Sequence, residues 1–125
     1  MNNKRSAWPA HPDYHIDISM ITKRIRMVVF DKVIADSRKV LLLNEQDHKP
    51  VYYFPTADVC LEQLQKIDNV TFCPYKGEAE YWALRAQNEQ LITVAWRYHD
   101  PFEQVKAIKN HIAFYSEVLD HIIIE

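Results

Sequence analysis

The segment Cys73-Pro74-Tyr75-Lys76-Gly77 holds the residues whose types and spacing are best suited to chemistry. An ammonium group close to a thiol favours the nucleophilic thiolate. Gly77 is the only glycine among 125 residues, which marks a left-handed turn or a point where another group approaches the backbone closely. The segment therefore predicts a reactive thiol, or an anion site built from Lys76 and the amides of the turn. A tight turn with a buried cysteine and a solvated lysine is the alternative interpretation.

Aromatic side chains with polar tips form a second set, namely Tyr52, Tyr53, Tyr75, Trp96 and Tyr98. Successive residues of a strand face opposite sides, so Tyr52 and Tyr53 cannot both enter one core. Such aromatics line ligand pockets, and they also occur in cores with a hydrogen-bonded hydroxyl. Both interpretations stay open. The pocket hypothesis places the 73–77 turn beside the end of the 91–98 segment, and its predicted lining is Tyr53, Cys73, Tyr75, Lys76, Trp96 and Tyr98.

The remaining histidines and cysteines give weaker signals. His99 follows Tyr98 at the expected end of a strand, where it could transfer a proton, although an exposed loop histidine explains it equally well. No metal site is predicted, because Pro12 interrupts the His11–His15 spacing and two cysteines cannot form a four-thiolate zinc site. No cofactor is predicted either. Cys60 is expected on a helix, buried and unreactive.

Composition excludes several function classes. Apolar residues make up 48% and charged residues 26% of the chain, as in soluble globular domains. The formal net charge of −2 argues against a nucleic-acid partner. One glycine cannot supply a P-loop, a dinucleotide-binding fingerprint or a nucleophile elbow. No run approaches the ~20 apolar residues of a membrane span, and no signal peptide is evident. We therefore expect a cytoplasmic protein with reduced thiols and no membrane partner; the oligomeric state stays open.

The elements that must position these residues are mainly strands. Residues 1–15 lack periodicity and predict an irregular arm, which Trp8 pins to the body. Residues 16–125 predict a single β domain. A helix of two to three turns is expected at 56–66, and a second short helix at 101–108. Strand-like runs lie at 25–29, 33–35, 40–43, 51–54, 70–72, 78–85, 91–98 and 111–115, with further apolar segments after Ile16 and at 118–124.

Six segments together resemble the bacterial family called domain of unknown function 427. They are His11-Pro12-Asp13, Ile34-Ala35-Asp36-Ser37, Pro50-Val51-Tyr52-Tyr53-Phe54-Pro55, Cys73-Pro74-Tyr75-Lys76-Gly77, Ala95-Trp96-x-Tyr98 and Ala113-Phe114-Tyr115. The resemblance runs from about His11 to His121. It implies a compact β-tent, an open barrel-like architecture also seen in methionine sulfoxide reductase B, here with two short helices. It brings no established reaction.

This chain departs from the family pattern at two places, and it also lacks a feature of many β-tent proteins. The two Cys-x-x-Cys pairs that hold zinc in many β-tent proteins are missing, so a structural zinc does not carry over. Thr56-Ala57-Asp58-Val59 stands where the family usually has Arg-Glu-Asp-Val, which removes one cation and one acid. Asn110 stands where the family favours glycine. Asparagine tolerates the left-handed conformation, so we expect that turn to survive.

The leading hypothesis is a domain that binds a small molecule beside the Cys73–Gly77 turn, with Lys76 favouring an anionic group. One alternative is an enzyme in which Cys73 is a nucleophile or redox thiol, Lys76 stabilises the thiolate, and Tyr98 or His99 transfers a proton. The other is a protein-interaction module in which the same aromatic residues form a hot spot. Whether the protein is an enzyme stays open at this point.

Overall fold

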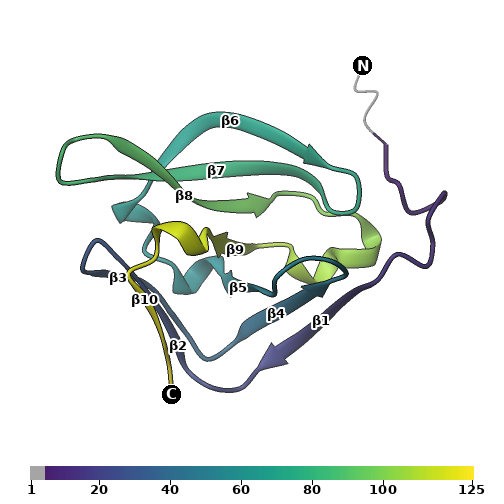
Figure 1. Ribbon diagram of the computed structural model, residues 1–125, viewed down its shortest axis with the longest axis horizontal. Coiled ribbons are helices and arrows are strands. Elements are labelled where there is room, and N and C mark those ends of the chain that lie inside the picture. The colour runs from purple at the N-terminus through teal and green to yellow at the C-terminus, as the bar shows by residue number, and fades with distance from the viewer. Residues whose placement is uncertain (1–4) are drawn as a thin grey trace.

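The computed structural model describes residues 5–125, and strands make up most of its secondary structure (Figure 1). The strands are β1 (Ile16–Ile21), β2 (Ile25–Val29), β3 (Lys32–Ser37), β4 (Val40–Glu45), β5 (Val51–Pro55), β6 (Gln65–Cys73), β7 (Gly77–Arg85), β8 (Leu91–Tyr98), β9 (His111–Phe114) and β10 (His121–Ile124). The mainly-β prediction is therefore confirmed. Residues 1–4 of the expected N-terminal arm lie outside the described residues, and residues 5–15 contain only turns and extended chain.

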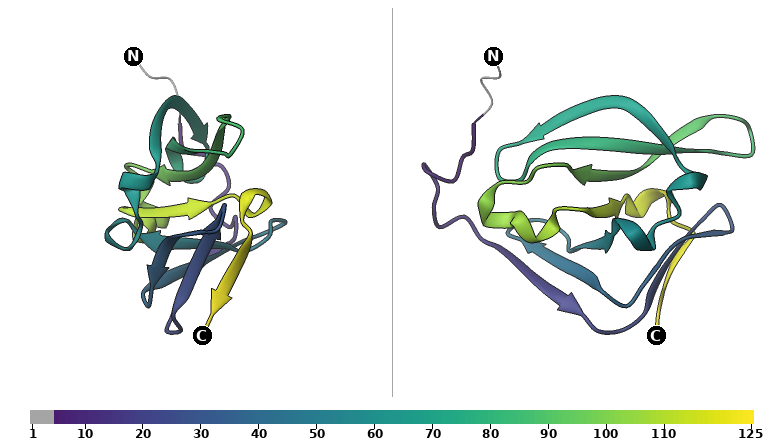
Figure 2. Two further views of the ribbon diagram at one scale, coloured as in Figure 1. Left: turned by 90° about the vertical axis from the view of Figure 1, so that its left-hand side faces the viewer. Right: turned by 180° about the vertical axis from the view of Figure 1, so that it is seen from behind.

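The strands form two antiparallel sheets within the described residues. The larger sheet has seven strands in the order β1-β4-β5-β9-β8-β7-β6, and the smaller has the order β10-β2-β3. The larger sheet is open, because β1 and β6 stand at its two edges. Figure 1 shows β1 and β4 on one side and β6 to β8 on the other, with β5 and β9 between them. Both views of Figure 2 place β2 and β10 at the opposite side of the molecule from β6 and β7.

The two segments expected to be helices form 3₁₀ turns instead. Residues 56–66 contain η1 (Thr56–Asp58) and η2 (Leu61–Gln63), and β6 already begins at Gln65. The second segment contains η3 (Glu103–Ile108), which is kinked at Val105 with a φ of −127°. Phe102, Val105 and Ile108 recur every three residues, which is the 3₁₀ period rather than the α-helical one. A fourth turn, η4, spans Ser116–Val118.

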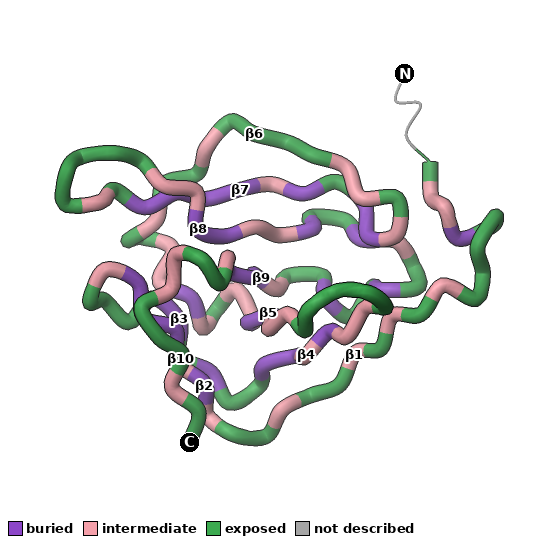
Figure 3. The backbone as a smooth tube through the Cα atoms, in the orientation of Figure 1, coloured by how far each residue is buried: buried purple, intermediate pink, exposed green. Residues whose placement is uncertain are grey.

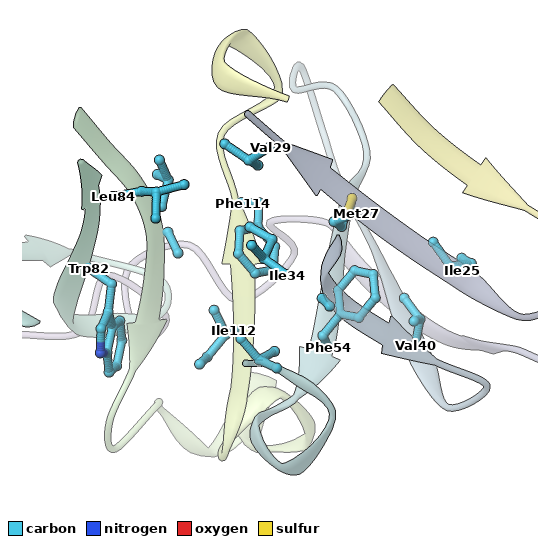
Figure 4. Close-up of a cluster of buried hydrophobic side chains, with 14 residues drawn as sticks. Ile25, Met27, Val29, Ile34, Val40, Phe54, Trp82, Leu84, Ile112 and Phe114 are labelled. Carbon is cyan, nitrogen blue, oxygen red and sulfur yellow. The ribbon is translucent and has the colours of Figure 1, made fainter. Parts of the chain in front are cut away.

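Apolar clusters cover both faces of the larger sheet at its centre. Phe54 and Ile112 point toward the smaller sheet and pack with Met27 and Ile34 (Figure 4). Their strand neighbours Tyr53 and Ala113 face the other way, into a second cluster. That second cluster is covered by Trp8 from the arm and by Val105 and Ile108 from η3. The central strands are therefore buried on both faces, whereas β1 and β6 contain no buried residue (Figure 3).

Several tight turns of this glycine-poor chain use other residues in the left-handed conformation. Within the described residues these are Phe30, Asp31, Asp47, Glu89 and Asn110, with φ between 50° and 68°. Phe30 and Asp31 form the turn between β2 and β3. Asn110 has a φ of 64°, so the expectation that asparagine preserves this turn is confirmed.

Gly77 has both a positive φ and a close backbone neighbour, the two features that a single glycine suggested. Its φ is +118°, which side chains rarely tolerate. A Cβ at this position would lie 3.3 Å from the carbonyl oxygen of Asp100. The Phe102 amide also donates to the Lys76 carbonyl oxygen at 3.0 Å, so the chain after β8 packs directly on this turn. Gly77 thus holds the end of β6 close to the end of β8.

The described residues contain no helix that is long enough and apolar enough to span a membrane.

Gly77→Ala should lower the free energy of unfolding by about 1–3 kcal/mol, because alanine is strained at this φ and its Cβ crowds Asp100. Urea unfolding at neutral pH measures the change. The matched control is Glu89→Gly, which places glycine at another positive φ, in an exposed turn. We expect that variant to stay within about 0.5 kcal/mol of the wild type. Equal effects of the two substitutions would show that the Gly77 backbone is not constrained.

Candidate functional site

A cavity of about 480 Å³ opens beside the Cys73–Gly77 turn. All six residues that the sequence placed in a pocket line it, from β5, from β8 and from the end of β6 with its following turn. The turn and the end of β8 are adjacent, since Ala79 pairs with Tyr98 in the β7–β8 ladder. The full lining is Tyr14, Leu43, Glu45, His48, Lys49, Val51, Tyr53, Cys73, Pro74, Tyr75, Lys76, Trp96 and Tyr98.

A buried ion pair forms one wall of the cavity. Lys76 Nζ lies 2.5 Å from Glu45 Oε1, and the two side chains are only 9% and 10% exposed. The Tyr14 hydroxyl donates to Glu45 Oε2 at 2.5 Å. Sequence reasoning missed Glu45, because it lies at the border of a polar stretch, 44–49, that is typical of a solvated loop. No pattern in the sequence marks its carboxylate as buried.

Protonation in this wall follows from burial and hydrogen bonding. Burial alone would raise the pKa of Glu45, but hydrogen bonds from Lys76 and Tyr14 outweigh that effect and lower it. Burial, followed by the hydrogen bond to Glu45, raises the pKa of Tyr14. At neutral pH Glu45 is therefore a carboxylate and Tyr14 a protonated donor. The ammonium of Lys76 is already matched by a carboxylate, which differs from the sequence-based picture of a lysine open to an anion.

The unpaired positive charge of the cavity lies at its rim. Lys49 is exposed and has no ion-pair partner among residues 5–125. His48 Nε2 lies 3.8 Å from Glu45 Oε2, and its side chain is largely exposed. Lys49 and Lys76 together carry two positive charges against the single carboxylate of Glu45. The lining as a whole therefore favours an anion, with Lys49 as the cation that an incoming ligand meets first.

Aromatic rings form the rest of the wall. Tyr53 and Trp96 meet edge to face with ring centroids 6.5 Å apart. Tyr14 stacks on Tyr75 at 3.7 Å with an interplanar angle of 7°. Burial is the largest of the effects that raise the pKa of Tyr53 and of Tyr98. Both phenols therefore stay neutral at pH 7 and can form hydrogen bonds. The cavity thus offers flat apolar surfaces together with hydroxyl groups, as small-molecule sites commonly do.

The N-terminal arm is fastened to the turn that carries the site. The amide of Ala7 donates to the Pro74 carbonyl oxygen at 2.9 Å. Trp8 Nε1 donates to the carbonyl oxygen of Tyr75, also at 2.9 Å, and the side chain of Trp8 is buried. Trp8 therefore pins the arm as its sequence context predicted. This attachment brings Tyr14 to the cavity.

The two cysteines are free and occupy different surroundings. Cys73 is half-buried in the cavity wall, with Sγ 4.0 Å from Lys76 Nζ. Cys60 lies between η1 and η2 rather than on a helix, and it is half-buried rather than fully buried as expected. Burial, then Glu62 and Asp36, raise the pKa of the Cys60 thiol. Cys60 is not part of the cavity lining.

His99 does not join the other candidate catalytic residues. Its side chain is 81% exposed, and Nδ1 lies 3.7 Å from Glu80 Oε2. It is absent from the cavity lining, whereas Tyr98 is present. No group of three or more histidine, cysteine or acidic side chains within the described residues could hold a metal ion.

The two family departures at positions 56 and 110 touch each other away from the cavity. The Thr56 amide and hydroxyl both donate to the Asn110 carbonyl oxygen, at 2.8 Å and 2.7 Å. Neither residue lines the cavity. Thr56 and Asn110 therefore contribute no group to this site.

Two comparisons with known proteins bear on the chain. The family model described as "Domain of unknown function (DUF427)" matches residues 17–125. The search of the curated proteins found no match. The matched span contains every residue of the cavity lining except Tyr14, which lies in the preceding arm.

Glu45→Gln should lower the free energy of unfolding at pH 7 by roughly 1–3 kcal/mol, because Lys76 loses its counter-charge in a largely buried position. The pKa of Glu45 is lower in the folded protein than the unfolded value of about 4.3. Its stabilisation is therefore complete above about pH 5 and is lost as the pH falls below 4. Urea unfolding between pH 7 and pH 3 should show the difference between wild type and variant shrinking with acidity.

The control for this experiment is Glu103→Gln, which removes an exposed carboxylate on η3. We expect little change at either pH for that variant. A wild-type-to-Glu45→Gln difference that stays constant down to pH 3 would contradict the assignment of an ionised, hydrogen-bonded Glu45.

Proposed function

This chain belongs to the domain of unknown function 427 family, and from that premise we propose that it binds a small anionic molecule with a flat body in the cavity beside the Cys73–Gly77 turn. The observation that supports the proposal is the lining itself. A cavity of about 480 Å³ has the size of common small-molecule sites and combines aromatic walls with a few polar groups. An unpaired cation, Lys49, stands at its rim.

The chemistry of the lining indicates which part of the ligand would sit where. The edges and faces of Trp96 and Tyr53 offer contact to a planar or apolar body. The anionic group would lie toward Lys49, since Lys76 is already neutralised by Glu45. Lys76 can still donate a hydrogen bond to the ligand while it is paired with Glu45, because a lysine has three N–H groups. Among the described residues, Lys49 is the only one of the two lysines whose charge is not matched, so the ligand would carry one negative charge rather than several.

Two further inferences concern the protein as a whole. The open seven-stranded sheet with a second sheet on one face is compatible with the β-tent architecture that the family resemblance implies. We also infer a cytoplasmic location, on the sequence grounds already given. Neither inference affects the chemistry of the cavity.

A reactive Cys73 is the second candidate function, and its position supports it. The thiol lies in the cavity wall within 4.0 Å of an ammonium, so a bound ligand would approach it directly. Of the two residues that the sequence suggested for proton transfer, Tyr98 lines the cavity and His99 does not. A pure protein-interaction module is less well supported, because the aromatic residues face a cavity and Tyr53 and Tyr98 are buried.

The binding proposal predicts that 4-hydroxyphenylacetate binds and that the matched amide, 4-hydroxyphenylacetamide, binds more weakly. Binding raises the apparent melting temperature by mass action, and NMR titration locates the site. Lys49→Gln should weaken binding of the carboxylate about fivefold, the equivalent of about 1 kcal/mol, and leave the amide unaffected. Lys32→Gln, on the smaller sheet, is the matched control. Equal affinity for the two compounds, or shifts outside the cavity residues, would reject the proposal.

The thiol candidate predicts that iodoacetamide labels Cys73 faster than Cys60. The pKa of Cys60 is raised, whereas Cys73 borders an open cavity beside Lys76. Mass spectrometry after labelling over a pH series measures the two rates, with Cys73→Ser to identify the peptide. Faster labelling of Cys60, or no labelling of Cys73 below about pH 9, would remove the reactive-thiol function and leave the binding proposal intact.

A further inference from the structure

A second opening adjoins the cavity, with Trp96 in the lining of both. It encloses about 260 Å³ and shares Lys49, Val51 and Trp96 with the first cavity. We call it the slot. Its full lining is Met27, Lys49, Pro50, Val51, Tyr52, Trp96, Phe114, Tyr115, Ser116, Glu117, Leu119 and Ile122.

The slot lies where β5 and β9 separate. The two strands pair from Pro55 only as far as Tyr53, which faces Ala113. Val51 and Tyr52 continue to pair with β4 on their other side, but they have no partner in β9. Successive residues of a strand direct their N–H and C=O groups to alternate sides. One of these two residues therefore turns its main-chain groups toward the slot, where an amide of a ligand could bond to them.

The walls of the slot are apolar and aromatic, and its two ends carry opposite charges. Trp96 and Tyr115 lie side by side with ring centroids 4.6 Å apart. Lys49 stands at the end shared with the first cavity. Glu117 stands at the end shared with a third depression of about 430 Å³. Both charged side chains are exposed, and neither has an ion-pair partner within residues 5–125.

The Glu117 end also offers hydroxyl groups. The third depression is lined by Thr71, Thr93 and Tyr81 as well as Tyr115. Burial, then Tyr81 and the Glu117 carboxylate, raise the pKa of Tyr115 to about 12, so its hydroxyl stays neutral. A carboxylate surrounded by neutral hydroxyls suits a primary ammonium group, which has three N–H donors to satisfy.

We propose that the ligand is a zwitterion of the size of a dipeptide, with its carboxylate at Lys49 and its ammonium at Glu117. Its aromatic or apolar side chain occupies the first cavity, and its amide passes Trp96 along the open edge of β5. This inference deepens the proposed function and rests on it, because the carboxylate site is the one already described. Two opposite charges, unpaired within the described residues, in adjoining openings that share Lys49, Val51 and Trp96 carry the argument.

The test uses glycyl-tyrosine, N-acetyl-glycyl-tyrosine and glycyl-tyrosinamide as probes, titrated at up to millimolar concentration by NMR against the whole chain. Removing the ammonium by acetylation, or the carboxylate by amidation, should each weaken binding about fivefold. Glu117→Gln should weaken glycyl-tyrosine by the same factor and leave the acetylated probe unchanged. Glu103→Gln, an exposed glutamate outside all three openings, is the matched control.

The outcomes separate this inference from the proposed function. Equal affinity for the free and acetylated probes, or an equal effect of Glu117→Gln on both, overturns the zwitterion and leaves an anion site. Binding of 4-hydroxyphenylacetate without binding of any dipeptide also overturns the zwitterion and leaves an anion site. Failure of 4-hydroxyphenylacetate and of every dipeptide overturns both proposals. Because the comparison of probes needs no variant, it holds even if Glu117→Gln alters the fold.

Discussion

The ion pair between Lys76 and Glu45 is the contact on which the site depends. Lys76 lies in the turn between β6 and β7, whereas Glu45 ends β4. Three strands, β5, β9 and β8, separate these positions in the sheet. A contact of 2.5 Å between their side chains therefore requires the sheet to bend until its two sides face each other. The cavity is the space that this bend encloses, and the ion pair is one of its walls.

Desolvating two charges is costly, and their mutual attraction repays that cost only when the remaining hydrogen-bonding capacity is satisfied. Glu45 meets this condition because Tyr14 occupies its second oxygen. An apolar pair would close the sheet with less desolvation, but it would not define how the two sides meet. We infer that a charged pair with a third, directional partner favours one arrangement, as a buried polar group does when it fixes the register of a coiled coil. The geometry of the aromatic walls follows from that arrangement.

Sequence reasoning identified the features that single residues determine. Gly77 marked its own turn, because one glycine in a chain of this length stands out and its φ could be anticipated. Tyr53, Trp96 and Tyr98 could be grouped because aromatic side chains with polar tips commonly line ligand pockets. Glu45 could not be found, since its burial depends on a lysine 31 positions away. The predicted helices were wrong because an apolar spacing of three fits a 3₁₀ turn, and short segments give too few repeats to separate the two periods. The slot depends on where β5 and β9 stop pairing, which alternation does not encode.

The attachment of the arm has an evolutionary consequence. Tyr14 is the part of the cavity wall that lies before the matched span, on a segment without regular secondary structure. Substitutions there are not constrained by strand pairing or by the two-faced packing of the central sheet. A lineage could therefore exchange the residue that meets Glu45, and with it the shape and hydrogen bonding of this wall, while inheriting the strands unchanged. One part of the lining could then vary on a stretch outside the sheet, while the other lining residues stay within the matched span.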